Sequence, residues 1–409
     1  MKIAIFSDCY LDLTGGIVTV INSDKAALES LGHTVYVFSS SFPKTESEKQ
    51  KLAKKHIYPV KSCQIFGRGI TPIARRPRVI EKELEKDFPE LKDFDIFYVH
   101  YEAGCSIAGL RFAKKYHIPS VQVMHGREDV GEEKLIPFGF RTIVAAALNM
   151  FHSWYLPHQN KIYHDNYLAD TIAKAKMWTL MVNHANYADF ILTPSEHFRQ
   201  KLLFYGVNKP ITALAHGIND AVVARKVTPK ALRSGAPLEM IWHSRVSGEK
   251  RIMSFLAALK ELPRDQYHLS VFGDGPDLIK AKAFVKKNNL NVKFFGNADF
   301  EKIWQTLQKS HLDVLVSYNY DTFGMTLLEA TAAGVPALIV DPDMQEILPK
   351  GGYVLADGPS PHDMAEAIKR IIKDPEIIQK MSLVQIGARS EKKSSLKIEK
   401  LEKIFKKLL

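Results

Sequence analysis

Residues 313–340 of the chain read DVLVSYNYDTFGMTLLEATAAGVPALIV, and this stretch decides the fold. An apolar run at its start is followed by a glycine-bearing loop, a helical pattern near 326–333 and a second apolar run, PALIV. Short apolar runs that alternate with helices are typical of parallel strands joined by crossover helices. The stretch therefore predicts one strand–helix–strand unit of a doubly wound α/β sheet.

The same alternation extends upstream from this unit. The runs EMIWHSR and LSVFGDG precede it, and the first half of the chain contains KIAIF, DIFYVH, SVQVMH and DFILTPS, with helical patterns between them. A chain of 409 residues is too long for one ordinary core. We therefore expect two Rossmann-like, doubly wound domains.

Composition sets the expected domain limits. Residues 219–237 are polar and basic and contain two prolines and a glycine that interrupt regular structure. We place a first domain at residues 1–219 and a second at 220–385. The last segment, 386–409, ends in SSLKIEKLEKIFKKLL, whose apolar side chains fall on one face of a basic helix. This helix is expected to pack back toward the first domain.

Charge and cysteine content restrict the partners and the compartment. The formal net charge of +11 favours an anionic partner, but composition alone does not separate nucleic acid, anionic lipid and a phosphorylated substrate. The three cysteines are far apart and form no CxxC pair, which argues against a disulfide framework or a zinc site. A reducing cytoplasm is the expected compartment, and no apolar run is long enough to predict a spanning helix.

Glycines and cations follow several predicted strands. In an open parallel sheet, ligands bind beyond the carboxyl ends of the strands, so motifs at those turns carry the most information. Gly16 belongs to a glycine pair before the first helix, and Gly273 lies in a GDGP turn. Arg245 and Lys250 flank a strand end and can neutralise a diphosphate. Each glycine motif alone is equally compatible with an ordinary structural turn, and a solvated basic turn is the favoured interpretation of Arg245 and Lys250 taken alone.

Residues 321–329 form the most specific segment. Asp321 lies in a loop after a predicted strand, and Glu329 lies inside the next helix. A loop carboxylate can accept hydrogen bonds from sugar hydroxyl groups, a helical one can hold ribose hydroxyl groups, and the N–H groups of residues 324–326 face a phosphate. The segment suits one nucleotide sugar.

Taken together, these motifs resemble those of family 4 glycosyltransferases, whose acidic-x7-acidic signature matches residues 321–329. The resemblance covers nearly the whole chain. It implies the GT-B fold, in which two Rossmann-like domains face a central cleft, and transfer with retention of anomeric configuration. Two positions depart from the family: the first acid is usually glutamate, and the loop at 342–346 lacks the usual glycine-rich turn. The implied donor-binding residues are Gly16, Arg245, Lys250, Gly273, Asp321, Phe323, Gly324, Met325, Thr326 and Glu329.

The resemblance also implies roles in catalysis. Arg245 and Lys250 would bind and stabilise the leaving diphosphate, and Asp321 would hold the transferred sugar. His125, at the end of SVQVMH, would polarise a sugar hydroxyl group, although a strand-end histidine is often only structural. Diphosphate would leave from the face that the acceptor enters. No metal or other cofactor is expected, and His100 and Glu102 are candidates for the acceptor pocket.

Residues 138–156 give the best indication of the acceptor. Their apolar side chains recur at steps of three and four, which predicts an amphipathic helix. Packing into the core and contact with a membrane interface are equally compatible with this pattern. The segment GRGITPIARRPR at 67–78 adds four arginines that would attract anionic headgroups. The candidate membrane or acceptor residues are Arg68, Arg75, Arg76, Arg78, Phe140, Arg141, Phe151, Trp154 and Tyr155.

Bacterial diacylglycerol glucosyltransferases resemble this arrangement of a basic, membrane-facing first domain and a nucleotide-sugar-binding second domain. The likeness implies transfer of glucose from UDP-glucose to a membrane lipid such as diacylglycerol, at the inner face of the cell membrane. A polysaccharide, polyprenol-linked or protein acceptor would keep every donor motif. A basic nucleic-acid-binding protein and a non-catalytic sugar-binding subunit are the non-enzymatic alternatives. We expect no nucleic-acid partner, because no groove-like interleaving of aromatic and basic residues is evident.

Overall fold

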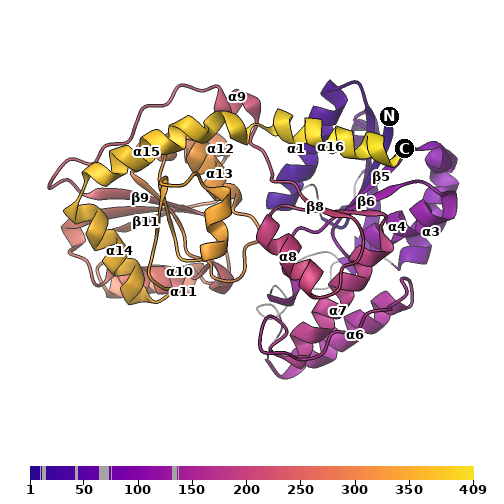
Figure 1. Ribbon diagram of the computed structural model, residues 1–409, viewed down its shortest axis with the longest axis horizontal. Helices are drawn as coiled ribbons and strands as arrows, with labels where there is room; N and C mark the ends of the chain where they lie inside the picture. Colours follow the sequence, from indigo (N-terminus) through magenta and orange to yellow (C-terminus); the bar gives the residue numbers. More distant parts are fainter. Residues whose placement is uncertain are drawn as a thin grey trace. The chain divides into compact units, whose positions relative to one another are not determined.

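The computed structural model describes residues 1–9, 11, 15–41, 45–63, 73–74, 76–130, 136 and 138–409 (Figure 1). The chain forms two compact units. Unit 1 comprises Met1–Ala215 together with Lys397–Leu409, and unit 2 comprises His216–Leu396. The two candidate arginines Arg68 and Arg75 lie outside the described residues.

Unit 1 is built on an eight-stranded sheet with the order β4-β3-β2-β1-β5-β6-β7-β8. All neighbouring strands run parallel except β3 and β4, which are antiparallel. Its strands are β1 (Lys2–Ser7), β2 (Thr34–Ser41), β3 (Ile57–Cys63), β4 (Ile73–Ala74), β5 (Ile96–His100), β6 (Ser120–Val123), β7 (Phe190–Thr193) and β8 (Ile211–Ala213). Its helices are α1 (Gly16–Ser30), α2 (Glu46–Ala53), α3 (Pro77–Asp87), α4 (Gly104–Tyr116), α6 (Arg141–Ser153), α7 (Ile172–Tyr187), α8 (Glu196–Phe204) and α16 (Ser394–Leu408), with 3-10 turns at Pro89–Asp93 and Phe138–Phe140.

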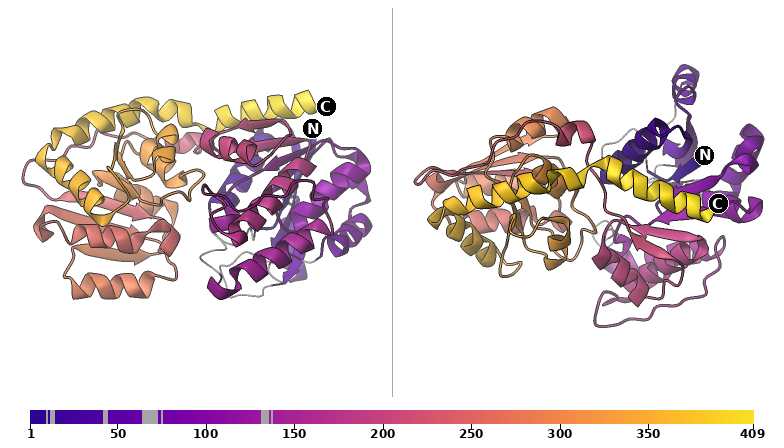
Figure 2. Two further views of the ribbon diagram at one scale, coloured as in Figure 1. Left: turned by 60° about the horizontal axis from the view of Figure 1, so that its bottom comes forward. Right: turned by 45° about the horizontal axis from the view of Figure 1, so that its top comes forward.

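Helices cover both faces of this sheet, which agrees with its central strands being almost completely buried and mostly apolar. On one face, Phe6 and Phe97 pack against Phe112 of α4. On the other face, Tyr98 packs against Phe405 of α16, and α1 joins the same cluster. In Figure 2 the chain termini lie side by side in unit 1, and α16 runs along it. The basic helix expected at 386–409 thus contributes its apolar face to the core of unit 1, although α16 itself begins only at Ser394.

Unit 2 is built on a six-stranded, entirely parallel sheet with the order β11-β10-β9-β12-β13-β14. Its strands are β9 (Leu238–His243), β10 (Tyr267–Phe272), β11 (Val292–Gly296), β12 (Leu312–Leu315), β13 (Ala337–Ile339) and β14 (Tyr353–Leu355). Its helices are α9 (Asp220–Val223), α10 (Ile252–Leu259), α11 (Leu278–Lys287), α12 (Phe300–Leu307), α13 (Met325–Ala332), α14 (Pro361–Lys373) and α15 (Glu376–Ala388), with 3-10 turns η3 (Gly248–Lys250), η4 (Arg264–Gln266), η5 (Pro342–Ile347) and η6 (Arg389–Lys392).

The two faces of this second sheet have separate cores. Trp242 and the apolar residues of α10 and α14 form the cluster on one face, whereas Ile241 packs against α12 and α13 on the other. Figure 1 shows α10 and α11 on the opposite side of the unit 2 strands from α12 and α13. Both units are therefore Rossmann-like, as the alternating sequence pattern predicts.

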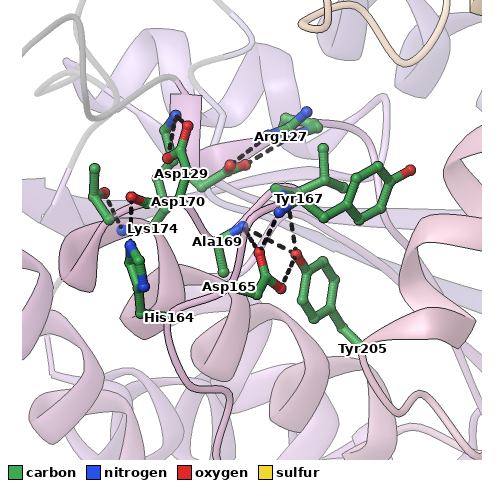
Figure 3. Close-up of polar contacts among 11 residues, drawn as sticks. Arg127, Asp129, His164, Asp165, Tyr167, Ala169, Asp170, Lys174 and Tyr205 are labelled. Carbon is green, nitrogen blue, oxygen red and sulfur yellow. Dashed lines mark hydrogen bonds and ion pairs between the residues drawn. The ribbon is translucent and has the colours of Figure 1, made fainter.

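The connection between α6 and α7 is held in place by a tyrosine. The hydroxyl group of Tyr205 donates to Asp165 at 2.8 Å and accepts from the N–H groups of Leu168 and Ala169 at 3.0 and 2.9 Å. Figure 3 shows this network beside the buried ion pair of Arg127 and Asp129. This long connection is thus ordered by side-chain hydrogen bonds, although it contains no helix or strand.

A row of histidines runs from His152 of α6 to His184 of α7. The Nδ1 atom of His152 is 2.7 Å from Nε2 of His158, and its Nε2 atom is 3.0 Å from Nδ1 of His184. The row ends at Gln122, whose Oε1 atom is 3.1 Å from Nε2 of His184. Burial, and then the charge of His158, lower the pKa of His184 to about 3. Burial lowers the pKa of His152 as well.

Acidification is therefore expected to destabilise unit 1. An unfolded histidine takes up a proton near pH 6.5, whereas folded His184 does so only near pH 3. The contribution of neutral His184 to the free energy of unfolding is fully present above pH 6.5. It is lost as the pH falls below that value, by about 2 kcal/mol for such a histidine at pH 5. Urea unfolding at pH 7 and pH 5 measures the loss. His184→Gln should show a smaller loss than the wild type, and an equal loss would contradict this explanation.

In the part of the chain covered by the structure, no helix is both long and apolar enough to cross a bilayer.

Candidate active site

The predicted cations of unit 2 follow strand β9. Arg245 lies two residues beyond the strand, and Lys250 ends η3. The Arg245 side chain is 61% exposed, and its guanidinium group donates to the hydroxyl group of Tyr320 at 3.0 Å. Lys250 is largely covered, and its Nζ atom lies 2.6 and 2.9 Å from the two carboxylate oxygens of Asp321.

Asp321 is held from two sides. Besides the Lys250 ammonium group, the hydroxyl group of Ser317 donates to its carboxylate. The Asp321 side chain is only 11% exposed. The structure therefore brings the predicted diphosphate ligand Lys250 and the predicted sugar ligand Asp321 into direct contact. An anion that binds Lys250 competes with this carboxylate.

The GDGP turn shapes the loop that carries Arg245. Gly273 has φ of +121°, and a Cβ atom there would lie 2.2 Å from the backbone oxygen of Ser244. The turn is tied to the same loop by the N–H of Val246, which donates to Asp274 O at 3.0 Å. Only glycine fits this backbone conformation and this close approach. Gly273 thus acts on the site through the position of the neighbouring loop.

Helix α13 begins at the segment predicted to bind phosphate. Gly324 is its N-cap, and Met325 and Thr326 form its first turn, where no helical carbonyl group is available to the backbone N–H groups. Such N–H groups and the helix dipole favour an anion. Phe323, just before the cap, makes an edge contact with the ring of His216 at 5.0 Å. The predicted segment therefore presents its backbone at the carboxyl end of β12.

Glu329 has a partner that sequence analysis missed. The Nδ1 atom of His243 lies 3.1 Å from Glu329 Oε2, and its Nε2 atom lies 3.1 Å from Asp313 Oδ1. Burial alone would lower the pKa of His243, but the two carboxylates raise it to about 10. The sequence feature that could have identified this partner is a histidine at the end of β9, two residues before Arg245.

In unit 1, the strand-end histidines contact each other. His100 Nδ1 lies 2.8 Å from His125 Nε2, and the rings stack with centroids 5.0 Å apart. Burial, and then the positive charge of Lys397, lower the pKa of His125 to about 3. His125 is therefore neutral near pH 7. His100 is fully buried, which places it as a support for His125.

Two further candidates in unit 1 differ in their surroundings. Glu102 is buried, and burial, followed by the charges of Glu128 and Asp8, holds its pKa well above the usual range. Its carboxyl group therefore favours the protonated form. Gly16 is exposed and is the first residue of α1.

Helix α6 turns large apolar side chains outward. Phe140, just before the helix, is 62% exposed, and Ile143, Met150 and Trp154 are 65%, 53% and 63% exposed. Phe151 is half-buried, and its ring packs against Tyr155 with centroids 5.1 Å apart. Core packing therefore accounts for only part of the predicted apolar pattern. We call Phe140, Ile143, Met150 and Trp154 the exposed α6 stripe.

Other candidate residues of unit 1 are basic. Arg141 donates from Nε to the backbone oxygen of Ile136 at 3.0 Å, and Arg76 and Arg78 at the start of α3 are exposed.

Among the described residues, no group of three or more histidine, cysteine, aspartate or glutamate side chains is arranged to hold a metal ion.

Family models and known proteins match both units. The Glycosyltransferase Family 4 model matches residues 14–222, and the model for glycosyl transferases group 1 matches residues 226–386. The chain is 26% identical to alpha-monoglucosyldiacylglycerol synthase of Acholeplasma laidlawii over 400 residues, which cover 93% of this chain and 91% of the relative. It is 23% identical over 350 residues to the enzyme of that name from Streptococcus pneumoniae, covering 83% and 70% of the two chains.

Solved structures have the same fold. HepE of Anabaena, solved in complex with UDP, matches over the full length of both chains with a TM-score of 0.68 and 16% identity. The lipopolysaccharide outer core galactosyltransferase WaaB also matches over the full length of both chains, with a TM-score of 0.64 and 18% identity. At these identities the likeness supports the GT-B fold alone.

Proposed function

The chain belongs to glycosyltransferase family 4, and we propose that it transfers glucose from UDP-glucose to a membrane lipid, such as diacylglycerol, with retention of anomeric configuration. The observation that carries the donor half is the gathering of Arg245, Lys250, Asp321 and Glu329 around the carboxyl ends of β9 and β12. The lipid half is supported by the two relatives named as glucosyldiacylglycerol synthases.

In the proposed donor complex, each group has a separate part of the nucleotide sugar. Lys250, Arg245 and the first N–H groups of α13 bind the diphosphate, Glu329 accepts from the ribose hydroxyl groups, and Asp321 accepts from the transferred sugar. Asp321 must then separate from Lys250, whose Nζ atom donates a hydrogen bond to Asp321 Oδ1 at 2.6 Å. The diphosphate then takes the place of the Asp321 carboxylate at the ammonium group, so the charge of Lys250 stays compensated.

The proposed chemistry follows the front face of the sugar. The bond from the anomeric carbon to the diphosphate oxygen breaks, and its electron pair goes to the diphosphate. The acceptor hydroxyl oxygen bonds to the same face of that carbon, and its proton passes to a diphosphate oxygen. Lys250 and Arg245 stabilise the charge that builds on the leaving group, which is the charge that a metal ion otherwise compensates. We assign no metal or other cofactor to the reaction.

From unit 1 we assign to His125 a hydrogen bond to a hydroxyl group of the transferred sugar. Its neutral state near pH 7 suits this role, because a neutral imidazole offers one donor and one acceptor. His100 Nδ1, at 2.8 Å from His125 Nε2, holds the ring in place. Glu102 is proposed as a lining group of the acceptor pocket, with a carboxyl group that donates when protonated.

The acceptor is proposed to be reached from a membrane surface through the exposed α6 stripe. A helix with exposed aromatic and aliphatic side chains on one face suits the boundary between headgroups and acyl chains. The net charge of +11 and the exposed Arg76 and Arg78 favour an anionic surface. We propose a peripheral association with the inner face of the cell membrane.

Ile143→Glu and Trp154→Glu are each expected to weaken membrane binding by about tenfold or more, because burial of such a side chain contributes about 1.5–3 kcal/mol. Co-sedimentation with vesicles of phosphatidylglycerol and phosphatidylcholine measures the effect. The fold should be preserved, since both side chains are already more than half exposed. Ile279→Glu on α11, where the isoleucine is 84% exposed, is the matched control and should bind like the wild type. Unchanged binding by both α6 variants would overturn the assignment of this surface.

Incubation with radiolabelled UDP-glucose tests the function as a whole. Acceptors are diacylglycerol, polyprenyl phosphate and a soluble glycan, each with and without vesicles, and Glu329→Ala is run beside the wild type. A labelled glycolipid made by the wild type alone supports the proposal. A labelled soluble glycan would keep the donor chemistry and reject the lipid acceptor. If the protein neither transfers glucose from UDP-glucose nor hydrolyses it, the proposed donor is rejected.

A further inference from the structure

His243, Asp313 and Glu329 form a buried row in unit 2. His243 ends β9, Asp313 lies in β12, and Glu329 lies in α13. The pairing of Asp313 with Ile241 puts the Asp313 side chain on the same sheet face as Ile241 and His243. This is the face that α13 covers, because Ile241 shares a core cluster with residues of that helix. The fold thus places one imidazole between a strand carboxylate and a helix carboxylate.

One cation of this row lies between two carboxylates. Asp313 is fully buried, and a buried carboxylate without a cation is strongly unfavourable. His243 lies 3.1 Å from Asp313 and 3.1 Å from Glu329, one contact from each ring nitrogen. With its pKa raised to about 10 by these carboxylates, the ring is an imidazolium near pH 7. Each of its two ring nitrogens then faces a different carboxylate as an ion-pair contact.

The exposure of the three side chains runs in one direction. Asp313 and His243 are 0% and 1% exposed, whereas Glu329 is 23% exposed. Glu329 is therefore the member that a ligand can reach. Its Oε2 atom faces His243, and this contact restricts the orientation of the carboxylate. A carboxylate that is held this way does not have to be ordered when a ligand binds.

We propose that His243 is a positioning residue for the nucleotide, which orients Glu329 for the ribose hydroxyl groups while Asp313 holds the His243 ring from its other side. This inference rests on the proposed function, in which Glu329 binds the ribose. His243 itself contacts no substrate. Its effect is confined to the part of the nucleotide that Glu329 touches.

Discrimination between ribose and deoxyribose tests this role. The affinities of UDP and of its 2′-deoxy and 3′-deoxy analogues are measured by calorimetry, which requires neither acceptor nor turnover. Wild-type protein is expected to bind at least one deoxy analogue roughly ten- to a hundredfold more weakly than UDP, as for loss of a hydrogen bond to a charged group. Glu329→Gln and His243→Asn should both reduce this ratio to within a few fold.

The matched control is His311→Asn. His311 is another half-buried histidine of unit 2, and its Nδ1 atom accepts from Glu239 N–H at 3.0 Å, away from Glu329. This variant should keep the wild-type ratio even if it loses stability. A merely structural His243 would weaken UDP and its deoxy analogues equally in His243→Asn, and that result would overturn the inference.

Asp313→Asn provides a second, independent readout if His243→Asn does not fold. Asp313 from β12 and Glu329 from α13 are the titratable groups that raise the pKa of His243. Removing one of them lowers that pKa, so UDP affinity should fall with rising pH at a lower pH than in the wild type. An unchanged pH profile would overturn the inference. Equal binding of UDP and both deoxy analogues by wild type, or no UDP binding at all, would instead reject the proposed donor site.

Discussion

Lys250→Ala is expected to lower kcat for glucose transfer by about 10²–10³-fold, which is the effect of removing one preorganised group that stabilises charge in a transition state. The protein should remain folded, because Lys250 ends the short turn η3 and lies outside the strands and core helices of unit 2, and Ser317 still donates to Asp321 when the lysine is removed. Steady-state kinetics with UDP-glucose and a lipid acceptor measure the change. A loss in kcat larger than the rise in KM would show that the cation acts mainly on the leaving group.

The environment of Lys250 explains why its removal should matter more than that of Arg245. Lys250 is 14% exposed, whereas Arg245 is 61% exposed. A charge that is shielded from water acts more strongly on a developing anion. The position of the Lys250 side chain is also fixed, since its Nζ atom hydrogen-bonds to both carboxylate oxygens of Asp321 and lies 5.4 Å from the ring centroid of Tyr320. The ammonium group is therefore positioned before the donor arrives.

Two variants make this prediction specific. Lys250→Arg keeps the charge and is expected to retain more activity than Lys250→Ala. Lys380→Ala removes a lysine that is 72% exposed on α15 of the same unit, and it should behave like the wild type. Activity of Lys250→Ala within about threefold of the wild type would contradict the role assigned to the ammonium group.

Much of the fold could be predicted because parallel sheets restrict where residues go. Apolar runs that alternate with helical patterns identified both Rossmann-like units. Since carboxyl ends of parallel strands share one sheet edge, Lys250, Asp321 and Glu329 could be predicted to gather there. The family resemblance added the roles, which the spacing alone does not supply.

The side-chain partners within the site could not be predicted. The ion pair between Lys250 and Asp321 joins residues that are 71 positions apart in the sequence, and it depends on the conformations of two loops. His243 looked like an ordinary strand residue, because its function depends on Asp313 and Glu329 in other elements. Sequence patterns carry no information on such pairings unless a motif already names them.

The orientation of α6 marks another limit. Apolar residues at helical spacing look the same whether they face a core or a solvent boundary. Only the structure shows that Ile143 and Trp154 point outward while His152 and Ala145 are buried. Similarly, the last helix was expected from residue 386, but residues up to Ala388 complete α15 and the final helix begins at Ser394.

Lys397→Met is expected to destabilise unit 1 by about 3–5 kcal/mol, because it leaves a buried carboxylate without its cation. Lys397 Nζ lies 2.6 Å from Asp24 Oδ2, and both side chains are buried. The hydroxyl group of Tyr98 also donates to Asp24, at 3.0 Å, but it carries no charge to replace the ammonium group. Urea or thermal unfolding of the full-length protein measures the loss.

The double variant Asp24→Asn with Lys397→Met separates the pair from the packing of α16. Removing both charges should restore much of the lost stability, since the large cost arises from the unpaired carboxylate. Ile398, Leu401 and Phe405 already fill the core beneath α16, so burial of apolar surface does not require the ion pair. Its contribution is to fix which residue of the helix faces Asp24, and therefore the register of α16 on the sheet. A single variant that loses less than about 1 kcal/mol would contradict this, because it would mean that Asp24 finds another partner or takes up a proton at little cost.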